Sequence, residues 1–127
     1  MKIIKSLFYF SNFTLMLFYL YPGNIFGCFF YNDCQIQPQL TRDLSIFSSN
    51  HLYSFIIVSL LGFISFKNRI KKIFLYLFLM AIFLEMMHII IPDRSFQIQD
   101  LLGNILGVVI SLTIIKLFYK KNELIRR

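Results

Sequence analysis

Four long apolar runs, separated by short clusters of basic residues, constrain what this chain can fold into. They cover about residues 6–22, 48–66, 72–91 and 100–119, and each has roughly the 17–25 residues that a helix needs to cross a hydrocarbon core. The chain is 57% hydrophobic and only 15% charged, whereas soluble domains are about 25% charged. Because backbone groups in hydrocarbon must bond within their own segment, we expect helices. The sequence therefore predicts a single all-α domain over residues 1–127, an integral membrane bundle of four transmembrane helices.

The basic residues predict the orientation of these helices. All but two of the 13 Lys and Arg residues lie at the N-terminus, at 67–72 or in the C-terminal tail, and the two exceptions are Arg42 and Arg94. By the positive-inside rule, both termini are cytoplasmic in a bacterial plasma membrane. The net charge of +7 is thereby explained by topology, and we expect membrane lipids rather than nucleic acid as partners.

The two cysteines lie in the longer outside loop, which spans about residues 22–50. Cys28 and Cys34 would meet an oxidising compartment there, which permits a disulfide. Two unpaired thiols fit the spacing equally well. A third interpretation is a lipoprotein signal that ends at Cys28, although Phe26 is bulky for its cleavage site.

Ionisable and amide side chains interrupt the third and fourth runs. Glu85 and His88 lie in the third, and Asp100 and Asn104 lie in the fourth. Such groups cost on the order of 2.5–3.5 kcal/mol each at the centre of a membrane helix, so they normally face the bundle interior and mark a site. At about 100° per residue, each pair lies on one face of its helix. The short connection at 92–99 makes the two helices antiparallel neighbours.

We therefore predict one polar pocket at the outer membrane face. Arg94, in the connection between the two helices, is expected to reach Glu85 or Asp100. The predicted members are Glu85, His88, Arg94, Asp100 and Asn104, with His51 from the second helix as a candidate sixth. Gly103 and Gly107 form a Gly-x-x-x-Gly pair, and Gly62 lies on a strip of small and polar residues in the second helix. These three glycines are predicted to let helices pack closely.

This part of the chain resembles the signature of the VanZ-like membrane proteins. That signature reads Glu-x-x-Gln, a Pro-x-Arg turn, then Asp, Asn and Gly at helical spacing. The matching positions here are Glu85, His88, Pro92, Arg94, Asp100, Asn104 and Gly107. His51, four residues before Phe55, is also similar to the family. The departures are His88 for the usual Gln, Ser111 for a frequent Gly, and a missing Asp-Lys pair before the second-helix His. The resemblance implies a small multi-helix protein of the cell envelope with a relative associated with teicoplanin resistance.

Three functions fit these residues. Arg94 suits the recognition or handling of an anionic lipid or lipid-linked precursor, because guanidinium binds phosphate through two hydrogen bonds. Glu85 and His88 are candidate catalytic residues for acid–base chemistry, but Ser95 is the only outer-loop hydroxyl near His88 and no nucleophile is placed with a base. A network that fixes helix packing or binds a partner protein is the third.

A metal site is not predicted, although Glu85, His88, His51 and Asp100 are all possible ligands. The Glu-x-x-His motif of di-metal bundles needs two copies and further Glu residues, and the chain has one copy. No cofactor is expected, the sequence does not decide for an enzyme, and it leaves the oligomeric state open. Transport is disfavoured because the inner half of the bundle lacks polar residues.

Overall fold

The computed structural model describes residues 2–125, and of residues 123–125 it describes the backbone alone. Within that part of the chain every regular element is helical and there are no strands. The elements are α1 (Lys2–Leu20), α2 (Ile25–Tyr31), α3 (Ser49–Ser65), a single 3-10 turn η1 (Lys67–Arg69), α4 (Ile70–Met87) and α5 (Ile98–Ile125). The predicted all-α fold class is confirmed.

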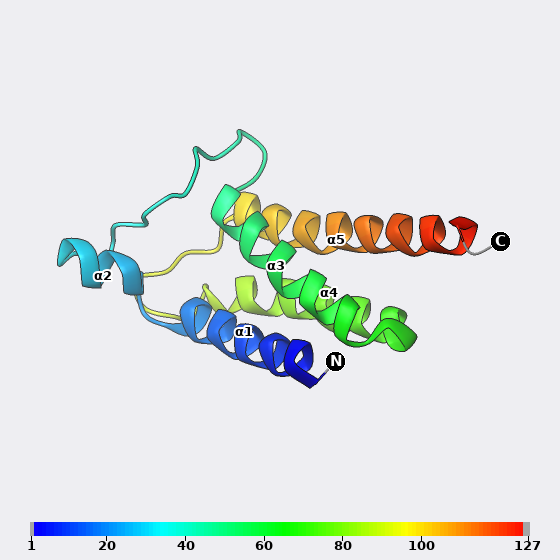
Figure 1. The fold of residues 1–127 in the computed structure, drawn as a ribbon. Coiled ribbons are helices and arrows are strands. Elements are labelled where there is room, and N and C mark those ends of the chain that lie inside the picture. The colour runs from blue at the N-terminus through cyan, green and yellow to red at the C-terminus, as the bar shows by residue number, and fades with distance from the viewer. Residues whose placement is uncertain (1, 126–127) are drawn as a thin grey trace.

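The four long helices form a bundle in which α3 packs against α1, α4 and α5. Figure 1 shows both described ends of the chain at one end of the bundle, while α2 and the connections from α1 to α3 and from α4 to α5 lie at the other. Helices α4 and α5 run in opposite directions and contact each other, as the short connection between them predicts. The buried polar site described below lies at the end nearer α2.

The core follows from helical periodicity. In α1 the buried residues Phe8, Asn12, Leu15 and Tyr19 recur every three or four positions and therefore share one face. The outward face of the same helix is also apolar, and Phe10, for example, is 69% exposed. An apolar core surrounded by an apolar exterior is the arrangement that a lipid environment favours.

Two helices, α1 and α5, are long and apolar enough to cross a membrane. Helix α3 has 17 residues, and the 18 residues of α4 include Lys71, Lys72 and Glu85. A bundle of four transmembrane helices, with both termini on the cytoplasmic side, therefore stays a prediction.

Helix boundaries differ from the predicted ones at several ends. The predicted third helix extends to residue 91, but α4 ends at Met87 and the chain continues in turns. Pro92 contributes to this early end, because proline has no N–H to bond the carbonyl group of His88 four residues earlier and its ring clashes with that group. The predicted fourth helix ends at residue 119, whereas α5 continues through the basic tail to Ile125.

Glycines set the distance between α3 and α5. A Cβ atom on Gly103 would lie 2.7 Å from the carbonyl oxygen of Ser48, and one on Gly107 would lie 2.8 Å from that of Leu52. These distances leave no room for a side chain. Gly62, on the other side of α3, is covered by the ring of Phe8.

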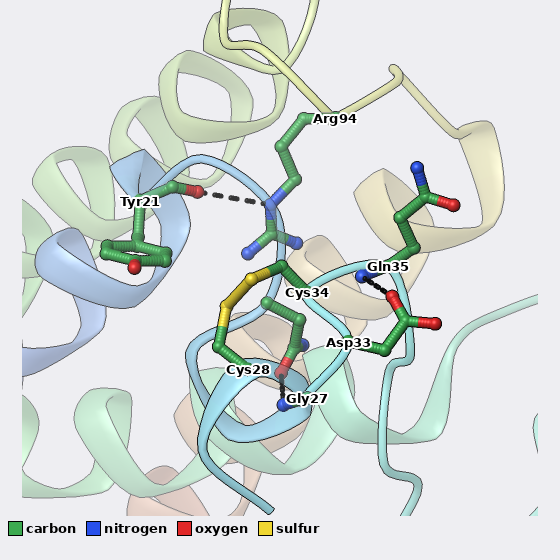
Figure 2. Close-up of a disulfide and its surroundings, with 8 residues drawn as sticks. Tyr21, Gly27, Cys28, Asp33, Cys34, Gln35 and Arg94 are labelled. Atoms are coloured by element: carbon green, nitrogen blue, oxygen red, sulfur yellow. Dashed lines mark hydrogen bonds between the residues drawn. A yellow bond between two sulfur atoms is a disulfide. The ribbon is translucent and has the colours of Figure 1, made fainter. Parts of the chain in front are cut away.

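The connection from α1 to α3 contains a short helix that was predicted as loop. The side chain of Asn24 caps the start of α2 by accepting a hydrogen bond from the Gly27 N–H at 2.9 Å. Asn32 ends the helix in the left-handed conformation, with φ 53°. Figure 2 shows the disulfide that joins Cys28 to Cys34 and closes this segment.

Candidate functional site

Six polar side chains meet at the end of the bundle nearer α2. They come from α1, α3, α4, α5 and the turn after α4, and none is more than 8% exposed. They are Tyr19, His51, Glu85, His88, Asp100 and Asn104. We call these six residues the polar cluster. A backbone hydrogen bond from Ser48 N–H to the carbonyl oxygen of Gln99, at 3.1 Å, ties the start of α3 to the start of α5 beside it.

His51 is the centre of the polar cluster. Its Nδ1 atom lies 2.7 Å from the Tyr19 hydroxyl and 3.2 Å from Asn104 Oδ1, and its Nε2 atom lies 3.4 Å from Asp100 Oδ2. The Tyr19 hydroxyl donates to Asn104 Oδ1 at 2.6 Å. Because a phenol has one proton to donate, the short contact between Tyr19 and His51 places a proton on Nδ1 of the imidazole.

Glu85 and His88 form the second part of the cluster. Glu85 Oε1 accepts a hydrogen bond from the Gln97 N–H at 3.0 Å and lies 3.3 Å from His88 Nδ1. His88 Nε2 lies 3.1 Å from the backbone carbonyl oxygen of Tyr19, to which it donates. Among the described residues, the other carboxylate oxygen of Glu85 has no hydrogen-bond partner. The side chain is fully buried, so this oxygen is an unusual feature.

Arg94 does not reach either carboxylate, which corrects the predicted pairing with Glu85 or Asp100. Its Nη2 atom donates to the carbonyl oxygen of Phe18 at 3.0 Å, and its Nε atom donates to that of Tyr21 at 3.4 Å. Figure 2 shows this side chain extending toward Tyr21. The reason is that the last carbonyl groups of α1 have no partners within the helix and attract a cation. Partial burial lowers the pKa of Arg94, but the guanidinium stays charged.

A cavity of about 440 Å³ adjoins the polar cluster. Its polar residues include His51, His88 and Arg94, and its apolar side includes Phe26 and Phe30 of α2. This volume lies in the range of small-ligand sites. Helix α2, which the sequence did not predict, therefore forms part of the wall.

The structure thus places five of the six predicted pocket residues in the polar cluster, with Arg94 at the neighbouring cavity. Tyr19 was not predicted, because it is one of seven tyrosines in an aromatic-rich chain. A signal for it exists in the sequence. Asn12, the other polar residue on the buried face of α1, lies seven positions earlier and accepts a hydrogen bond from Tyr76 at 3.0 Å. Two polar residues seven positions apart share a helix face.

The fold and the polar cluster define a class: small all-helical proteins with apolar outer faces and a buried polar site at one end of the bundle. The family model described as VanZ/LLP1 matches residues 3–119. The chain therefore belongs to the VanZ/LLP1 family, and the matched stretch contains every residue of the polar cluster. A search of curated proteins and a search of solved structures both gave no match.

Proposed function

We propose that this protein is a multi-pass protein of the bacterial plasma membrane that binds an anionic lipid or a lipid-linked envelope precursor in the cavity beside Arg94. Both termini would then be cytoplasmic and the cavity would lie in the outer leaflet. The observation that carries the proposal is a fixed guanidinium at the edge of an aromatic-lined cavity.

The guanidinium group of Arg94 has a fixed orientation and N–H donors that an anion could use. Within the described part of the chain, two of its five N–H donors bond the carbonyl oxygens of Phe18 and Tyr21 at the end of α1, so three remain for a ligand. The carbonyl groups hold the side chain in one orientation, which reduces the ordering cost on binding. A phosphate or carboxylate in the cavity would accept two parallel hydrogen bonds from the unused N–H groups of the guanidinium.

The apolar wall of the cavity suits the hydrocarbon part of the same ligand. Phe18, Ile25, Phe26, Phe30 and Leu40 line it. A molecule with an anionic headgroup and a lipid chain would place its charge at Arg94 and its first methylene groups against these side chains. Burial of each methylene group contributes about 0.8 kcal/mol.

The membrane location is supported by several features together. Helices α1 and α5 have the length and composition of membrane spans, and the outward faces of the bundle carry many exposed Phe, Leu and Ile side chains. The end of the bundle with both described chain ends also carries most of the basic residues. Membership of the VanZ/LLP1 family favours a role in the cell envelope that is related to glycopeptide resistance.

A second candidate function is acid–base catalysis by Glu85 and His88. The observation that favours it is the 3.3 Å contact between Glu85 Oε1 and His88 Nδ1, since His88 also lines the cavity. Such a pair can move a proton to or from a bound molecule. A chain without lipid binding or catalysis would instead serve as a membrane subunit for a partner protein.

Native mass spectrometry in a mild detergent tests the lipid proposal. The proteins compared are wild type, Arg94→Ala, Arg94→Lys and Arg42→Ala, with far-UV circular dichroism to match their folding. Arg42 is an exposed arginine in the loop before α3 and serves as the control for loss of one positive charge.

We expect wild type and Arg42→Ala to retain one anionic lipid that Arg94→Ala loses. Arg94→Lys should retain it weakly, because lysine keeps the charge and lacks the two-pronged geometry. Equal lipid in wild type and a folded Arg94→Ala variant would refute the proposal. Absence of bound lipid from wild type would refute it as well and would favour the role of a partner-binding subunit.

A further inference from the structure

Three potential metal ligands converge within the polar cluster. One ligand atom from each of His51, Glu85 and Asp100 lies within 4.8 Å of the other two, and all three residues are buried. The ligands come from α3, α4 and α5, so the site exists only when these helices are packed together. We infer that these residues bind a divalent transition-metal ion of the zinc class.

The hydrogen bonds of His51 leave its metal-binding atom free of a proton. The Tyr19 hydroxyl donates to Asn104, so the His51 proton lies on Nδ1 and points at the Tyr19 oxygen. A neutral imidazole with a proton on Nδ1 has a lone pair on Nε2. That lone pair faces the carboxylate of Asp100, and two acceptor atoms 3.4 Å apart repel each other unless a proton or a cation lies between them.

The distance between His51 Nε2 and Asp100 Oδ2 matches that between two ligand atoms of one metal ion. Zinc binds imidazole nitrogen and carboxylate oxygen at about 2.0–2.2 Å, which in a tetrahedron separates neighbouring ligand atoms by about 3.4 Å. The His51 and Asp100 atoms already have this separation, 3.4 Å. A proton shared between them would be expected to draw the two atoms closer, to about 2.7–2.9 Å.

The Glu85 side chain gives independent support for a metal ion at this position. This side chain is completely buried, and one carboxylate oxygen has no hydrogen-bond partner within the described residues, while the other accepts from the Gln97 N–H and lies 3.3 Å from His88 Nδ1. A buried carboxylate oxygen without a donor costs free energy that a bound cation would offset. Arg94 forms no ion pair with it, since its described hydrogen bonds go to the carbonyl oxygens of Phe18 and Tyr21.

The surrounding groups are those that orient metal ligands. A ligating histidine normally donates its other N–H to a fixed acceptor, and ligating carboxylates are hydrogen-bonded in turn. Here Tyr19 and Asn104 hold His51, and the Gln97 N–H holds Glu85. One imidazole and two carboxylates suit zinc and similar ions. His51 also lines the cavity, which gives an ion a route to the site.

The test uses the full chain in detergent, without an affinity tag and stripped with a chelator. Zn²⁺ binding is measured by isothermal titration calorimetry, and Co²⁺ binding by visible absorption, whose intensity reports four-coordinate geometry. We expect one ion per chain. Asp100→Asn and Glu85→Gln should each lower the affinity at least tenfold, and Tyr19→Phe by about 10-fold to 100-fold.

The matched control is Asp93→Asn, which removes the same charge from an exposed residue at the same end of the bundle. Asp93 has a φ of 57°, a conformation that asparagine also adopts. Its metal affinity should equal that of wild type.

Wild-type protein that binds no stoichiometric Zn²⁺ or Co²⁺ would overturn the inference, and this result does not depend on the folding of any variant. Unchanged affinity in folded Asp100→Asn and Glu85→Gln would overturn it too. The metal site is independent of the proposed lipid binding. Arg94→Lys should keep the metal ion, so loss of lipid binding and loss of metal binding are separate outcomes.

Discussion

Replacing Gly107 with alanine should destabilise the bundle, because α3 leaves no space for the added methyl group. The new Cβ atom would lie 2.7 Å from Phe55 Cβ and 2.8 Å from the carbonyl oxygen of Leu52. Carbon atoms pack best at about 3.5–4.0 Å, so the two helices would have to separate by roughly 1 Å at this point. Neither contact is the end of a flexible side chain, so local rotation gives no relief.

The size of the effect follows from two opposing contributions. Forcing one extra methyl group into a packed interior costs about 1–3 kcal/mol, and contacts with backbone and Cβ atoms favour the upper part of that range. Alanine recovers about 0.8–1 kcal/mol through its higher helix propensity. We expect the free energy of unfolding to fall by about 1–2 kcal/mol, which lowers the ratio of folded to unfolded protein by a factor of about 5–30.

Reversible unfolding in mixed micelles, with increasing mole fractions of sodium dodecyl sulfate and detection by circular dichroism, measures this loss. Gly62→Ala is the comparison, since its Cβ atom would meet Phe8 Cε2 at 2.8 Å and a ring can rotate away. Its loss should be smaller. Stability of Gly107→Ala equal to or above wild type would refute the reasoning, as would a larger loss in Gly62→Ala.

Three more predictions follow from the fold and its polar contacts. Tyr19→Phe removes the hydroxyl that joins α1 to α3 and α5, and the same unfolding assay should show a loss of about 1 kcal/mol; no loss would mean that the hydroxyl contributes nothing net. Replacing Cys28 and Cys34 with serine removes a short covalent loop and should cost about 2 kcal/mol, with faster proteolysis around α2; unchanged cleavage would contradict this. In that cysteine-free background, an impermeant maleimide should label Ser95→Cys in intact cells and Asn68→Cys only after permeabilisation, and the reverse pattern would exclude cytoplasmic termini.

Much of the fold was predictable because the apolar runs are long and clusters of basic residues lie at several of their ends. The antiparallel pairing of α4 and α5 was predictable because a short connection usually joins antiparallel neighbours. Helix α2 was not predictable, since seven residues show no clear period and its end depends on Asn32 in a left-handed conformation. Its position also involves the Cys28–Cys34 bond, whose formation the spacing of the cysteines left undecided.

For the site, the rarity of charged groups in apolar segments was informative, and it identified Glu85 and Asp100 directly. The predicted partner of Arg94 was wrong for a different reason. The position of the Arg94 side chain depends on the end of α1, since one of its acceptors is Tyr21, 73 residues earlier in the chain. No local sequence pattern predicts that contact. The sequence identified which residues are costly to bury, while the pairing among them depends on how four helices pack.

The polar cluster also sets an order of assembly. Tyr19 lies on the first long helix, while Asp100 and Asn104 lie on the last, and chains are made from the N-terminus at about 5–20 residues per second. Tyr19 and His51 are therefore synthesised several seconds before Asp100 and Asn104, which are their partners in the polar cluster. During that interval the earlier helices can already form the contact between Tyr19 and His51, but they lack the polar partners that α5 supplies. A chain shortened before residue 100 would lack Asp100 and Asn104, so Tyr19 and His51 would stay without these two partners.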